Sequence, residues 1–166
     1  MTTIDNTPTR SGADQDTLAA ARTVCELFAA TAAGHADRPA IHSADGAIRW
    51  TWSEYATRVR AAAAGLAGLG LGRGDTIACW LTNRPEFHVA DSAAMLLGAT
   101  SFSVYGTFTV EQAEHVIGDA GSRILVTEPA FLERALTLRE SGANALEHVV
   151  LVEGEHESAL TWDELL

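Results

Sequence analysis

A run of four glycines at alternate positions, Gly68, Gly70, Gly72 and Gly74, is the first pattern that suggests chemistry. Glycine-rich loops hold phosphate groups where a strand runs into a helix, because the helix N-terminus supplies free N–H groups and a positive dipole end. This run has the opposite polarity, since it follows a helical pattern and precedes a strand-like one. We therefore interpret these glycines as the end of a helix.

His88 and Asp91 have a spacing that suggests acid–base chemistry. Three residues apart on an expected helix, they can form a hydrogen bond, and the carboxylate could orient the imidazole as a general base. The sequence places no Ser or Cys nucleophile that would complete a triad. The alternative, a solvated helix face, is the interpretation that we favour.

Spacings typical of metal sites do not occur in the sequence. The six histidines show no H-x-x-x-H pattern, and the two cysteines, Cys25 and Cys79, fall on an expected helix and an expected strand. We expect two buried, reduced thiols in preference to a disulfide or a metal site. The sequence predicts no metal-binding residues.

All eleven basic residues are arginine, and there is no lysine. Chemistry that needs a lysine amine is therefore beyond this chain alone. The formal net charge of −11 disfavours nucleic acid and anionic lipid as partners, because both attract basic patches. Solubility is the simpler role for this charge.

Residues 76–107 predict a βαβ unit around which the rest of the chain is arranged. Residues 76–81 are a short apolar run, typical of a strand buried on both faces of a parallel sheet. Asn83 is a candidate helix cap, Pro85 suits the first turn, and apolar residues then recur at helical spacing. Residues 100–105 return to a strand-like composition, so the two strands should be parallel.

Helix starts are marked by four S/T-x-x-E/Q capping boxes, in which a hydroxyl and a side-chain carbonyl or carboxylate oxygen each accept a backbone N–H. They begin at Thr23, Thr51, Thr109 and Thr161. Two short apolar runs around Asp45-Gly46 predict a hairpin, and residues 123–127 and 148–152 predict two further strands.

Strands and helices alternate, so the fold class is α/β, with a mainly parallel sheet flanked by helices. We expect four core strands and the hairpin. Residues 1–16 are polar and aperiodic and predict a disordered tail, while residues 17–166 form one domain. No apolar run reaches the roughly 18–20 residues of a membrane span, and the start of the sequence lacks signal-peptide features, so cytoplasm is the expected location.

The segments that follow resemble the opening region of long-chain fatty-acid–CoA ligases, which belong to the AMP-forming, adenylate-forming superfamily. The resemblance extends from about Thr23 to the last residue and depends on the order and spacing of several short pieces. These pieces are Gly74-Asp75, Asn83-Arg84-Pro85-Glu86-Phe87, Leu97-Gly98-Ala99, Ser103-Val104-Tyr105 and Glu111-Gln112.

The resemblance implies a role and also exposes what is missing. Family members use ATP and Mg²⁺ to form an acyl-adenylate and then transfer the acyl group to CoA. Their phosphate loop, ribose-binding acid and catalytic lysine have no counterpart in this sequence, so no catalytic or cofactor-binding residue carries over. Tyr105 and Thr107 lie at the C-terminal end of an expected strand, where ligands of open sheets bind, and are our candidates for lining the acyl side.

These features favour an incomplete, first α/β part of the large N-terminal domain of a fatty-acid–CoA ligase, a ligase of fatty acid metabolism that is inactive alone. Its partner would be the missing downstream part of the ligase, or a second copy through self-association. A second hypothesis is a non-catalytic module that pairs with a separate polypeptide carrying the phosphate loop and C-terminal lid. A self-sufficient nucleotide-binding or signalling domain is least favoured, because no glycine loop leads from a strand into a helix.

The final residues, from Thr161 to Leu166, specify a helix start with very little helix after it. Nucleation is the costly step of helix formation, and isolated helices need roughly 12–15 residues to be even marginal in water. We therefore expect this segment to be frayed or loosely docked.

Overall fold

The computed structural model describes residues 19–43 and 46–166 of the chain. The expected disordered tail lies outside these residues, and so does Asp45 of the expected hairpin turn. Where the chain is described, no helix is both long enough and apolar enough to cross a membrane.

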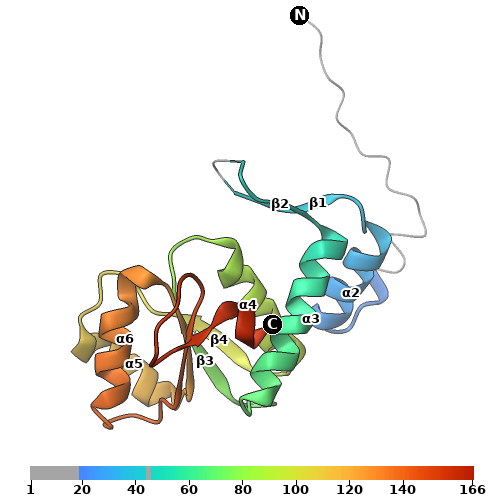
Figure 1. Cartoon of the computed structure of the whole chain (residues 1–166). Coiled ribbons are helices and arrows are strands. Elements are labelled where there is room, and N and C mark those ends of the chain that lie inside the picture. Colours follow the sequence, from blue (N-terminus) through green and yellow to red (C-terminus); the bar gives the residue numbers. More distant parts are fainter. Residues whose placement is uncertain (1–18, 44–45) are drawn as a thin grey trace, which may run out of the picture.

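Within the described residues, the strands form two sheets (Figure 1). A small antiparallel hairpin consists of β1 and β2, and a five-stranded parallel sheet has the order β4-β3-β5-β6-β7. The strand bounds are β1 Pro39–His42, β2 Arg49–Thr51, β3 Thr76–Trp80, β4 Thr100–Ser103, β5 Ile124–Thr127, β6 His148–Leu151 and β7 Leu160–Thr161.

Helices cover both faces of the parallel sheet, as Figure 1 shows. One core joins α3 and α4 to the sheet, and a second joins α5 and α6 to its opposite face. The helix bounds are α2 Val24–Gly34, α3 Trp52–Gly68, α4 Pro85–Leu96, α5 Val110–Ala120, the short 3-10 helix η1 Pro129–Phe131, α6 Leu132–Glu140 and α7 Trp162–Leu165. The predicted α/β class with a mainly parallel sheet is confirmed.

Three of the four predicted capping boxes are complete, at Thr51, Thr109 and Thr161. Thr23 also caps its helix, but the Glu26 carboxylate accepts the N–H of Arg22 at 2.6 Å, so the reciprocal half is displaced by one residue. These caps are local, which is why the sequence predicts them well.

Other expectations at element ends need correction. The N-cap of α4 is Arg84 without a side-chain cap bond, so Asn83 does not cap it. The strand expected to reach Tyr105 ends at Ser103. The parallel sheet has five strands where four were expected, because the two-residue strand β7 pairs with β6.

The last helix is docked, so the expectation of a frayed end was wrong. Leu165 is buried at 4% exposure in the core that α3 and α4 share with the sheet. The close approach depends on Gly65 of α3, where an added Cβ would lie 1.9 Å from the carbonyl oxygen of Leu165. The nucleation cost is therefore met by tertiary packing against a helix that offers no side chain at the contact.

This contact gives a stability test. The substitution Gly65→Ala should displace α7 and lose part of the roughly 2 kcal/mol that burying a leucine side chain contributes. The matched control Gly68→Ala lies on the same helix, and an added Cβ there would meet open space. The control should be neutral or stabilising, by up to about 1 kcal/mol, because alanine favours helix. Urea denaturation measures both, and equal stability of the two variants would contradict the docking argument.

Candidate functional site

The carboxyl ends of the parallel strands form the edge of the sheet at which open α/β folds bind ligands. Three groups of residues lie along this edge: a charge network after β3, β5 and β6, the turn after β4, and an acidic cleft after β6.

The charge network is centred on Arg84, which follows β3. Its guanidinium donates to Glu86 at 2.7 Å and pairs with Glu128 at 3.6 Å and Glu153 at 3.4 Å. Glu128 is buried at 6% exposure and also accepts the N–H and hydroxyl of Thr82 at 3.1 and 2.9 Å. Arg84 therefore ties together the carboxyl ends of three strands.

Charge also shifts the pKa of this guanidinium. Burial alone would lower the pKa of Arg84, but the bond to Glu86 and the negative charges of three glutamates raise it above its ordinary value. One cation faces three carboxylates, so the network carries excess negative charge and does not suit an anionic ligand.

Tyr105 and Thr107 lie in the turn after β4, and both are exposed, Tyr105 at 69%. Neither residue belongs to a strand, and neither lines the acidic cleft at the end of β6. The Tyr105 ring meets Phe108 edge-on, with centroids 5.3 Å apart. The predicted lining role of these two residues stays a prediction.

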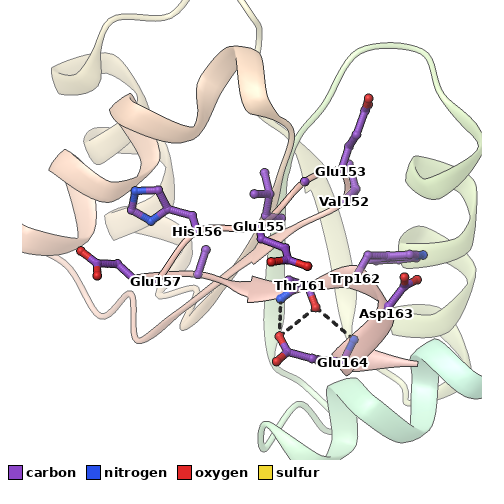
Figure 2. A pocket seen from close by; sticks show the side chains of 12 residues that line it. Val152, Glu153, Glu155, His156, Glu157, Thr161, Trp162, Asp163 and Glu164 are labelled. Carbon is purple, nitrogen blue, oxygen red and sulfur yellow. Dashed lines mark hydrogen bonds between the residues drawn. The ribbon is translucent and has the colours of Figure 1, made fainter.

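The acidic cleft has a volume of about 890 Å³ and lies between the end of β6, the loop that follows and the start of α7 (Figure 2). Its side chains include five carboxylates and one histidine: Glu153, Glu155, His156, Glu157, Asp163 and Glu164. Figure 2 shows that Glu164 is bound to Thr161, as the capping box requires. Negative charge makes this cleft unsuited to phosphate or fatty carboxylate.

Two of the other candidates from the sequence, Asp91 and Gly70, form hydrogen bonds within the fold. His88 is exposed, while the Asp91 carboxylate accepts a hydrogen bond from the Ser101 hydroxyl. Gly70 ends a turn in a left-handed conformation, φ +87°, and its carbonyl accepts a bond from Arg123 at 2.8 Å. Within the described residues, no group of three or more His, Cys, Asp or Glu could hold a metal ion.

Both cysteines are free thiols. Burial, together with the negative charge of Asp91, raises the pKa of Cys79 from about 9 to about 12. Cys25 is only half-buried and donates to the carbonyl of Met95 at 3.2 Å, so the expectation of burial holds for Cys79 and only partly for Cys25.

The thiols should differ in reactivity. An aromatic disulfide reagent at pH 8 should label Cys25 quickly and Cys79 only at the rate of unfolding, because the thiolate is the nucleophile. Because its folded pKa is raised, Cys79 contributes stability that is fully present below about pH 9 and is lost as the pH rises towards 12. The variant Cys25→Ser should lack the fast phase; fast labelling of that variant would contradict the burial of Cys79.

The charge network also predicts a difference between its members. Arg84→Gln leaves the buried Glu128 without its cation and should cost on the order of 1–3 kcal/mol. Glu153→Gln removes a partner that is 69% exposed and should change stability by less than about 0.5 kcal/mol. Urea denaturation at neutral pH measures the stability of both variants. Equal losses of stability would show that Arg84 is not the residue that connects the network.

The sequence matches the model of one enzyme family and several known proteins. The model of the AMP-binding enzyme family matches residues 28–165. An uncharacterized protein of Mycobacterium tuberculosis, Rv1549, is 43% identical over 132 residues, which cover 80% of this chain and 73% of that protein. The 4-coumarate–CoA ligase 3 of Oryza sativa is 31% identical over 129 residues, covering 78% of this chain and 23% of that enzyme.

Solved structures show the same fold. A long-chain-fatty-acid–CoA ligase (FadD1) from Archaeoglobus fulgidus has a TM-score of 0.75 at 19% identity, covering 86% of this chain and 30% of that one. The N-terminal domain of FACL13 from Mycobacterium tuberculosis has a TM-score of 0.73 at 17% identity, covering 80% of this chain and 34% of that one. The chain thus spans about a third or less of these ligases. By the family match over residues 28–165, the chain belongs to the AMP-binding enzyme family.

Proposed function

We propose that this chain supplies the first α/β part of an AMP-forming acyl–CoA ligase, located in the cytoplasm, and that it has no ligase activity alone. The family match over residues 28–165 carries the proposal. In this proposal residues 17–166 form the α/β domain and residues 1–16 a tail. A fatty acid is the proposed substrate, because long-chain-fatty-acid ligases recur among the similar proteins.

The residues present do not fit the nucleotide that this family takes. Clamping transferring phosphates needs cations and N–H groups directed at the phosphates. This chain has no lysine, and its glycine run ends a helix. The carboxyl edge is dominated by glutamates. ATP, Mg²⁺ and CoA would accordingly be bound by other parts of a complete ligase.

The proposed contribution of this chain is to the acyl side. Tyr105 and Thr107 stand exposed on the turn after β4, at the carboxyl edge but away from the acidic cleft. An aromatic ring there offers apolar surface to an acyl chain without facing the carboxylates of the cleft.

A second candidate function is a non-catalytic module that binds a separate polypeptide carrying the phosphate loop and lid. The relationship to Rv1549 favours it, because the similarity covers 73% of that protein. In this case the chain would form a complex whose other member holds all catalytic groups.

Pyrophosphate exchange tests these proposals. The pure chain with ATP, Mg²⁺ and dodecanoate should give no fatty-acid-dependent exchange between pyrophosphate and ATP. Mixing it with a polypeptide made of the remaining part of the long-chain-fatty-acid–CoA ligase FadD15, whose matching segment is 30% identical, should restore exchange.

The outcomes separate the candidates. Exchange by the chain alone would overturn the proposal of an inactive part. A stable complex that shows no more pyrophosphate exchange than the remaining part of FadD15 alone would favour the non-catalytic module.

A further inference from the structure

We propose that Arg134 is the residue that positions Tyr105 for ligand contact, although it lies on α6 and was not singled out by the sequence. The guanidinium holds the turn that presents the ring. The inference rests on the proposed function for the nature of the ligand, an acyl chain, and on the geometry alone for the positioning.

The turn after β4 is tight and closely packed. Residues 105–108 are closed by the N–H of Phe108, which donates to the carbonyl of Tyr105 at 3.0 Å. Gly106 is pressed against Phe131, because an added Cβ there would lie 3.0 Å from Cζ of that ring. The turn therefore cannot move towards η1.

Side chains from two other elements hold the carbonyls of this turn. Arg134 Nη1 donates to Phe108 at 2.7 Å and to Gly106 at 3.2 Å, and its Nη2 donates to Gly106 at 3.3 Å. Trp80 Nε1, from β3, donates to the carbonyl of Tyr105 at 3.1 Å. Carbonyls of three of the four turn residues are thus fixed from α6 and β3.

Aromatic rings fix the guanidinium in turn. Arg134 Cζ lies 4.9 Å from the centroid of the Trp80 ring and 5.0 Å from that of Phe131. These two rings are stacked, with centroids 5.7 Å apart and planes 18° from parallel. A planar fork held over aromatic rings is a geometry that arginine adopts and lysine does not.

The result is a rigid turn that carries an exposed ring. Packing of the turn uses its backbone, Gly106 and the Phe108 side chain, and leaves Tyr105 69% exposed. An apolar surface that is already ordered loses little conformational freedom on binding, so it binds more tightly than a mobile one. Arg134 would act through this order, without touching the ligand.

The test compares variants of two arginines on the same helix. Arg134→Met removes the fork, while Arg139→Met removes an arginine of α6 that donates to a different carbonyl, that of Ser158 at 2.7 Å. A third variant, Gly106→Ala, displaces the turn against Phe131 and keeps the charge of Arg134. Each is measured by hydrogen exchange at the Phe108 amide, by the shift of Tyr105 ring resonances on titration with dodecanoate below its micelle concentration, and by urea denaturation.

Arg134→Met removes three hydrogen bonds and should lower Phe108 protection at least about tenfold. Dodecanoate binding should weaken by the factor by which the ordered fraction of the turn falls. Gly106→Ala should weaken binding in the same way, while Arg139→Met should change neither readout. Arg134→Lys should not restore binding, because it returns the charge without the fork.

Three results would overturn the inference: unchanged protection in Arg134→Met, unchanged binding in Gly106→Ala, or full rescue by lysine, which would indicate direct attraction of the carboxylate. If the unsubstituted chain shows no Tyr105 shift with dodecanoate while Arg134→Met loosens the turn, the proposed acyl-side role fails and the positioning of the turn stands.

Discussion

Burial of β3 on both of its faces is the constraint on which the rest of the structure depends. Ile77 and Cys79 point into the core shared with α3 and α4, while Ala78 and Trp80 point into the core shared with α5 and α6. A strand buried in this way can satisfy its backbone only through neighbours on both sides, here the parallel strands β4 and β5. Parallel neighbours need crossover helices, and these helices supply the two layers that bury the strand.

Arginines fasten the two edges of this sheet. At the carboxyl edge, Arg84 joins the segments after β3, β5 and β6 through glutamates. At the amino edge, Arg123 bonds the carbonyl of Gly70 at 2.8 Å and pairs with Glu147 at 3.4 Å, so it joins the end of α3 to the start of β6. The glycine run that first suggests a phosphate loop thus takes part in a structural contact, the hydrogen bond between Arg123 and Gly70.

The sequence predicts what is local in the chain. The hydroxyl of each capping box and its partner, a carboxylate or an amide, lie three residues apart, and the strand β3 is a continuous apolar run. Both are therefore recognisable without the fold. The strand β7 is only two residues long and forms because it pairs with β6. Hydrophobic periodicity cannot predict this pairing. The docked α7 likewise depends on Gly65, about a hundred residues earlier in the chain.

The candidate site likewise has features that the sequence predicts and features that depend on the fold. Tyr105 and Thr107 could be selected from the sequence because they lie at the C-terminal end of an expected strand, but their separation from the cleft depends on the order of the strands in the sheet. Arg134 contacts carbonyls 26 and 28 residues away, and a guanidinium bonded to backbone leaves no sign in side-chain spacing. Sequence patterns therefore do not predict contacts between a side chain and backbone groups that are distant in the sequence.

The use of arginine for every basic position has a practical consequence. Reagents that target side-chain amines, such as succinimidyl esters or aldehydes, find no lysine in this sequence. They would leave the contacts of Arg84, Arg123 and Arg134 intact. Dicarbonyl reagents that condense with guanidinium groups would instead attack the contacts that fasten the strands and the turn. Labelling or immobilising this protein through its side chains thus means choosing thiol or carboxylate chemistry, with the half-buried Cys25 as the more accessible thiol.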